Sequence, residues 1–334
     1  MCPRDWLKAP VPGSRFGDRR VSGCCQTLGH DQSLYRFWPV LLRQLQAMAL
    51  ADGTEPGLLE VLTGSPFGLQ LLGGRRPLFD PLGWDPEIGI DAALDLLGWS
   101  CERSGGGDAG TALERLRGAT ATGLVLAGPV EMGLLGHHPG AAGAIGADHY
   151  LLVVAFEGDI VRFHDPHGHP YATLPAGAFA AAWRGDSIEY PHAEYTMRTG
   201  FRRVREVGAL DALRASVPTA ITWLNGRPEQ APPGSLGTGE AARTLAGLAE
   251  AALTDGQRDE LMLFAVRVGA RRLADAEYWL GQIGLEDAAV ITGARARLVG
   301  GLQYPLVTGD NATIAKMLRD LAPTYHQLCQ ALSA

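Results

Sequence analysis

The stretch HYLLVVAFEGDIVRFHD, residues 149–165, decides the fold class. Its two apolar arms are rich in β-branched and aromatic residues, and Glu157-Gly158-Asp159 interrupts them with turn-forming chemistry. We therefore expect an antiparallel β-hairpin with a three-residue loop.

In that register Asp165 lies opposite Leu151, on the same sheet face as His149 and diagonal to it. Diagonal neighbours are about 7–8 Å apart, within reach of an imidazole and a carboxylate that lean together. A two-residue loop would instead put the two side chains on opposite faces. The hairpin thus predicts a couple in which Asp165 holds one ring nitrogen of His149 and the other accepts a proton.

The segments around the hairpin predict helices first, a compact sheet next and helices last. Further strands are expected at residues 123–130, 171–174 and 187–190. Helices are expected before them at residues 26–49, 88–97 and 110–116. More helices are expected after them at residues 241–253, 258–273, 274–283, 285–302 and 314–332. This order is typical of an α+β fold.

A composition break at NGRPEQAPPGSLGTG, residues 225–239, is rich in Pro and Gly and has no apolar periodicity. We expect a mixed domain over residues 1–225, a linker over residues 226–239 and a helical domain over residues 240–334.

Composition excludes several classes of protein. With 46% hydrophobic and 19% charged residues among 334, the chain can bury a core and is not of disordered type. A net charge of −7 argues against phosphate-neutralising nucleic-acid binding. Because no apolar run reaches the roughly 18 residues of a membrane span and the N-terminus lacks a signal-peptide block, a cytoplasmic protein without membrane contact is expected.

Five cysteines are few and odd in number, so free thiols are expected in a reducing compartment. Cys24 and Cys25 stand where the first long helix should begin, after Ser22 as a candidate N-cap. A thiol there meets the positive end of the helix dipole and unpaired N–H groups, which favour the thiolate and can hold an oxyanion. Each of these residues alone also fits a structural role, but Cys, His and Asp in this order predict a catalytic triad.

The chain resembles the butirosin biosynthesis protein H family, a papain-like fold related to bacteriocin-processing cysteine peptidases. The similarity spans residues 20–200, through GCCQT (23–27), LTGSPFGL (62–69), GADHYLLVVAFEGDIVRFHDPHGHP (146–170) and FAAAW (179–183). Residues 240–334 resemble the accessory C-terminal domain often fused to that fold. The resemblance implies a papain-like catalytic domain with Cys25 as nucleophile, His149 as base and Asp165 as orienting acid.

The resemblance also implies a function. An acyl group passes from an acyl carrier protein or CoA thioester to the cysteine and then to an amine-bearing small molecule, in specialised-metabolite biosynthesis and without a cofactor. A carrier protein is acidic, so a basic patch is expected at Arg15, Arg19, Arg20 and Arg36. Many papain-like enzymes have an oxyanion-hole Gln where Arg19 stands. A cysteine hydrolase (peptidase, amidase or thioesterase) and a catalytically silent binding scaffold stay open as alternatives, as does Cys24 as the nucleophile.

Six of the nine histidines lie between residues 137 and 169. Their density suggests zinc ligands, but no His-x-x-x-His or Cys-x-x-Cys spacing occurs and strand alternation points His164 away from Asp165. No metal is therefore expected. Side chains near the couple are instead expected to contact substrate: Cys24, Gln26, His137, His138, His164 and His167.

Overall fold

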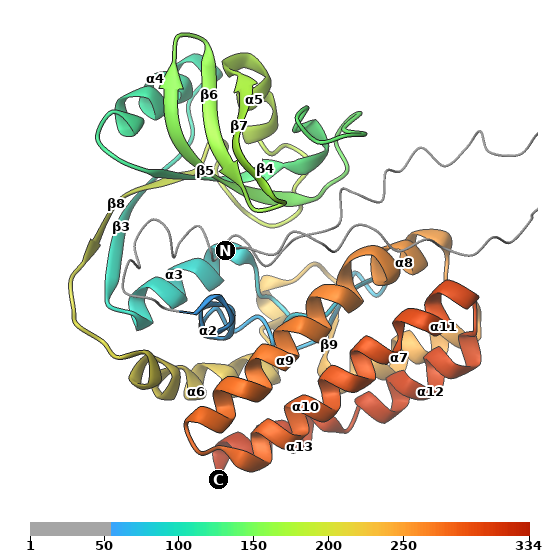
Figure 1. Ribbon diagram of the computed structural model, residues 1–334. Coiled ribbons are helices and arrows are strands. Elements are labelled where there is room, and N and C mark those ends of the chain that lie inside the picture. Colours follow the sequence, from blue (N-terminus) through green and yellow to red (C-terminus); the bar gives the residue numbers. More distant parts are fainter. Residues whose placement is uncertain (1–54) are drawn as a thin grey trace, which may run out of the picture.

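The computed structural model describes residues 55–334 and shows antiparallel sheets followed by a helical C-terminal region (Figure 1). This arrangement confirms the expected α+β class. The expected helix at residues 26–49, and with it Cys24, Cys25 and Gln26, lies outside the described residues.

The larger sheet has six strands in the order β3-β8-β4-β5-β6-β7. Their bounds are β3 Trp99–Ser104, β4 Val125–Glu131, β5 Asp148–Glu157, β6 Ile160–Asp165, β7 His169–Pro175 and β8 Met197–Arg203. All pairings are antiparallel, and β3 and β8 were not expected from the sequence. In Figure 1 these two strands connect the sheet to the helices below it.

The strand expected at residues 187–190 was wrong. This segment is a loop before Pro191, and its side chains rather than its backbone bind the sheet. The hydroxyl of Ser187 donates to Glu131, and that of Tyr190 donates to Asp148 at 3.3 Å.

One face of the six-stranded sheet is covered by α4 (Ala109–Thr120) and α5 (Ala176–Trp183) (Figure 1). Helix α4 begins at Asp108, whose carboxylate accepts from the Thr111 N–H at 2.8 Å and so caps the first turn. Apolar residues of both helices and of β4–β6 form a core of their own.

The second core is larger and joins both ends of the described chain. It contains α2 (Pro56–Leu62), α3 (Pro86–Leu96), α6 (Ala209–Asn225) and the C-terminal helices, with Leu126 and Tyr150 from the opposite face of the sheet. Helix α3 is capped by Asp85, which accepts from the Ile88 N–H at 2.9 Å.

The composition break at residues 226–239 contains the short helix η4 (Pro228–Gln230) and strand β9 (Leu236–Gly237). Strand β9 pairs with β1 (Gln70–Leu72), which also pairs with β2 (Arg76–Leu78). Strand β9, which directly precedes the C-terminal helices, therefore pairs with a strand from much earlier in the chain. The helices also share a core with those earlier residues.

The C-terminal helices are α7 Thr238–Glu250, α8 Asp255–Asp259, α9 Val266–Gln282, α10 Glu286–Gly301, α11 Gln303–Thr308, α12 Asn311–Leu321 and α13 Thr324–Ser333. A π-helical segment, Glu260–Ala265, joins α8 to α9, so the expected helices at 258–273 and 274–283 are one run. The expected helix at 314–332 is two, because Pro323 stands between α12 and α13.

None of the helices in residues 55–334 combines the length and the apolar character that crossing a membrane requires.

Candidate active site

The β5–β6 hairpin turns through two residues, Gly158 and Asp159, because Glu157 pairs with Ile160. The expected three-residue loop was therefore wrong. An extra residue, Val154, lies between the paired positions Val153 and Ala155 and forms a β-bulge. The bulge restores the register lost at the turn, and the imidazole and carboxylate meet on one face after all.

His149 and Asp165 are in direct contact, as the hairpin predicted. The Nε2 of His149 lies 2.9 Å from Oδ1 of Asp165, and the two residues are 1% and 3% exposed. This contact fixes the plane of the imidazole and directs Nδ1 to the other side of the ring.

Asp165 has more partners than a single histidine. The Nε2 atoms of His137 and His138 lie 2.6 and 2.5 Å from its Oδ2, and the backbone N–H of His167 donates to Oδ1 at 2.6 Å. Burial alone would raise the pKa of Asp165, but the charge of His149 and the hydrogen bonds from three imidazoles hold it well below its usual range. These donors therefore favour the ionised form of the carboxyl group.

The loop that carries His137 and His138 is held by the buried carboxylate of Glu131 at the end of β4. Its Oε1 accepts from the N–H groups of Gly133 and Ile145 at 3.0 and 2.9 Å, and its Oε2 accepts from Gly146 at 3.0 Å. Glu131 thus joins both ends of the loop 132–147 to the sheet.

Strand β7 contains a second irregularity. Phe163 pairs with Ala172 but Asp165 pairs with His169, so β7 has one extra residue between these positions. Tyr171 has a φ of +57°, in the left-handed region that non-glycine residues rarely adopt. The extra residue places His169 directly opposite Asp165, on the face of the imidazoles.

His164, an expected substrate contact, lies on the other face of β6. Its Nδ1 accepts from the backbone N–H of Tyr171 at 3.1 Å, and its ring packs edge-on against the Tyr171 ring. Strand alternation therefore directs it away from Asp165, as expected, and burial lowers its pKa.

His167 closes the cluster on the side opposite His137. Its ring centroid is 4.8 Å from that of His149, and it stacks on His138 at 5.3 Å. Burial, reinforced by the neighbouring charge of His149, lowers the pKa of His167 to about 2, so its ring is neutral.

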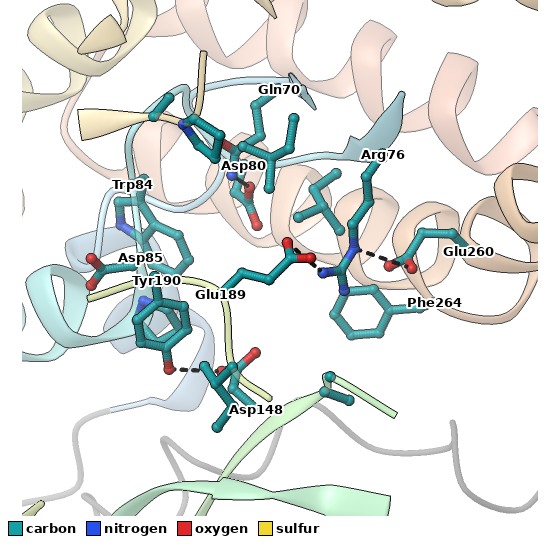
Figure 2. Close-up of a pocket in the computed structure, with 18 of the residues that line it drawn as sticks. Gln70, Arg76, Asp80, Trp84, Asp85, Asp148, Glu189, Tyr190, Glu260 and Phe264 are labelled. Carbon is teal, nitrogen blue, oxygen red and sulfur yellow. Dashed lines mark hydrogen bonds and ion pairs between the residues drawn. The ribbon is translucent and has the colours of Figure 1, made fainter. Parts of the chain in front are cut away.

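His167 also lines a cavity of about 490 Å³ between the sheet and the helices. Its wall includes the aromatic rings of Trp84, Tyr190 and Phe264, and Asp148, the residue before His149, projects into it from β5 (Figure 2). Seven carboxylates line the cavity against three arginines: Asp80, Asp85, Asp148, Glu189, Glu229, Asp259 and Glu260, with Arg76, Arg267 and Arg272. The cavity therefore favours cations.

Arg76 crosses the cavity and forms ion pairs with Glu189 and Glu260, each at 3.4 Å (Figure 2). Glu260 and Phe264 belong to the π-helical segment before α9, a kind of irregularity that is frequent at functional sites. Burial raises the pKa of Glu260, which the Arg76 charge opposes.

Asp148 lies at one end of a row of polar contacts. The hydroxyl of Tyr190 donates to it, and that hydroxyl lies 3.1 Å from the hydroxyl of Tyr150, which donates to Glu87 at 2.8 Å. Burial raises the pKa of Asp148 to about 6, although the charges of Arg76 and His149 lower it. This carboxyl group thus titrates near neutrality.

The cysteines proposed as nucleophiles, Cys24 and Cys25, lie outside residues 55–334, as do Gln26 and the arginines of the expected basic patch. Within the described chain, burial raises the pKa of the Cys101 thiol, which disfavours its thiolate.

Sequence reasoning missed the cavity, because its wall comes from segments scattered between Gln70 and Arg272. It also missed the convergence of His137 and His138 on Asp165, since these residues are far apart in sequence and show no ligand spacing. The one available signal was the density of histidines between residues 137 and 169.

Comparison with known proteins supports a relationship for the helical region. Residues 232–333 match the family model of the YobF C-terminal domain, a range that contains β9 and α7–α13. The chain is 29% identical over 143 residues to the uncharacterized protein YobF of Bacillus subtilis (strain 168), covering 42% of this chain and 46% of that protein. The chain thus spans about half the length of the curated relative that it matches. The histidine cluster lies outside residues 232–333.

Proposed function

We propose that this chain is a papain-like cysteine acyltransferase that moves an acyl group from a carrier-protein or CoA thioester to an amine. Cys25 is the nucleophile, His149 the general base and Asp165 the group that orients the imidazole. The observation that carries the proposal is the buried contact of 2.9 Å between His149 Nε2 and Asp165 Oδ1. A base held in this way keeps one tautomer and is stabilised when it becomes an imidazolium.

The reaction has two steps. The Cys25 thiol gives its proton to Nδ1 of His149, its sulfur attacks the thioester carbonyl, and the bond from that carbon to the carrier sulfur breaks. The departing thiolate takes the proton from the imidazolium. A neutral amine then attacks the acyl-enzyme, its proton passes to His149, and the C–S bond to Cys25 breaks as the amide forms.

The cavity lined by Asp148 and His167 supports an amine as the acceptor. Carboxylates outnumber arginines on its wall, and Trp84, Tyr190 and Phe264 provide aromatic surfaces, which together attract cations. Asp148 lines the cavity and directly precedes His149 in β5, so it is placed to bind an ammonium group of the acceptor other than the neutral amine that attacks.

Two measurements test the proposal. Iodoacetamide near neutral pH should alkylate Cys25 at least about 100-fold faster than the reference thiol Cys329, and His149→Ala should remove that advantage. Equal rates at Cys25 and Cys329 would point instead to a binding scaffold.

Intact-mass analysis after mixing with acyl thioesters should give a mass gain of one acyl group in the wild type and none in Cys25→Ser. Loss of that gain upon addition of a diamine, with the amide as product, supports transfer. Loss to water at an unchanged rate with or without the amine would make the protein a hydrolase, and a gain that persists in Cys25→Ser but not in Cys24→Ser would move the nucleophile to Cys24.

A further inference from the structure

The side chains around Asp165 are more numerous than the orientation of one base requires. His149 contacts Oδ1 of Asp165, whereas the Nε2 atoms of His137 and His138 both contact Oδ2. His167 and His169 lie against the same rings, so five imidazoles surround one carboxylate. The proposed transfer reaction gives no role to the imidazoles on the Oδ2 side.

The atoms on the Oδ2 side form a compact donor set. One donor atom from each of His137, His138 and Asp165 lies within 4.8 Å of the others. Imidazole nitrogen and carboxylate oxygen are preferred ligands of Zn²⁺, at about 2.0–2.1 Å, which places ligand atoms about 3.3 Å apart in a tetrahedral site. Retraction of each ring by less than about 1 Å from its present contact with Oδ2 opens room for the ion.

We propose that His137 Nε2, His138 Nε2 and Asp165 Oδ2 bind a divalent cation of the zinc class. His169 lies beside these ligands, with its ring centroid 5.5 and 5.2 Å from those of His137 and His138. The extra residue in β7 places this imidazole opposite Asp165, and Tyr171 beside it has left-handed backbone.

The surroundings suit a closed site rather than an open one. His138 is 4% and Asp165 3% exposed, and Glu131 holds the loop that supplies both histidines through three backbone N–H groups. An ion there would tie that loop to the ends of β6 and β7. It would also fix Oδ2 while leaving Oδ1 for His149, so one carboxylate serves both sites.

Metal content of the Cys24→Ser/Cys25→Ser variant tests the site without the two thiols proposed as nucleophiles. After saturation with Zn²⁺ and desalting, we expect one bound ion per chain. His137→Ala and His138→Ala, made in that background, should each bind Zn²⁺ at least about 100-fold more weakly, since even the loss of an outer hydrogen bond to a ligand costs about 10–100-fold. The matched control His326→Ala, an exposed histidine on α13, should bind as the parent does.

Binding of Co²⁺ is measured on the Cys24→Ser/Cys25→Ser parent itself, so this test does not depend on whether a histidine variant folds. The parent variant should show the visible bands of a four-coordinate nitrogen and oxygen site, and Zn²⁺ should abolish them. No stoichiometric ion, or unchanged affinity in a folded His138→Ala, would overturn the proposal and leave a hydrogen-bonded cluster only. Because Cys25 is absent from these proteins, the result is independent of the proposed acyl transfer.

Discussion

Two carboxyl groups lie at the same end of the six-stranded sheet, Asp165 on β6 and Asp148 on β5. Their surroundings differ in charge and in hydrogen-bond donors. Asp165 is surrounded by imidazole and N–H donors, and these hold its pKa well below the usual range. Asp148 faces a cavity rich in other carboxylates, where burial raises its pKa to about 6. Burial acts on both in the same direction, so the donors around each carboxyl group decide whether its pKa falls or rises.

The largest effect is expected from removing the carboxylate of Asp165. Asp165→Ala leaves three imidazoles and the His167 N–H without their buried acceptor, which should lower the free energy of unfolding by about 3 kcal/mol. Denaturant unfolding measures the change, with the exposed Asp186→Ala as a control. A loss below about 1 kcal/mol would mean that the imidazoles do not depend on this group.

A smaller loss of stability is expected when Glu131 no longer binds the loop 132–147. Glu131→Ala removes the acceptor of three backbone N–H groups and of Ser187, at a cost of about 2 kcal/mol. Hydrogen exchange at Gly133, Ile145 and Gly146 should accelerate, whereas Glu114→Ala on the exposed face of α4 should leave it unchanged. Unaltered protection of these amides would show that the loop is held by something other than Glu131.

Asp148 should make the stability of the protein depend on pH. Because its pKa rises from 3.8 to about 6 on folding, the unfolded chain loses this proton first, and stability falls as the pH rises across that interval. Asp148→Asn should remove a decline of about 2 kcal/mol, seen by comparing unfolding free energies of the two proteins at both ends of the interval. Parallel pH profiles for the two proteins would contradict the raised pKa.

The smallest effect is expected at Tyr190, whose hydroxyl helps to stabilise the Asp148 carboxylate. Tyr190→Phe should raise the pKa of Asp148 further and change stability by only about 0.5 kcal/mol, since Tyr150 keeps Glu87 as its partner. Carbon-13 NMR titration of the Asp148 carboxyl reports the shift. A lowered pKa would mean that the hydroxyl acts on the cavity in some other way.

The part of the fold that could be predicted is the part that local patterns specify. Alternation and turn chemistry identified β5 and β6, and helical periodicity identified α3 and α4. Strands β3 and β8 were not predicted, because their exposed faces carry charge and Met197–Arg203 has no run of apolar residues.

The candidate site also has a part that local patterns predict and a part that they do not. His149 and Asp165 are neighbours on one hairpin, so their meeting could be inferred from spacing. His137, His138 and His169 reach Asp165 only through the Glu131-bound loop and the extra residue in β7, and the cavity needs segments from both cores. Tertiary packing makes these contacts, and no local pattern encodes it.

The extra residue at Val154 has a consequence for comparing this chain with its relatives. Turn length and bulge cancel each other, so a homologue can gain or lose one residue in this hairpin only if a second change of one residue accompanies it. Insertions and deletions here should come in compensating pairs. An alignment that places a single gap between the histidine and the aspartate would describe either a misalignment or a protein that has lost the couple.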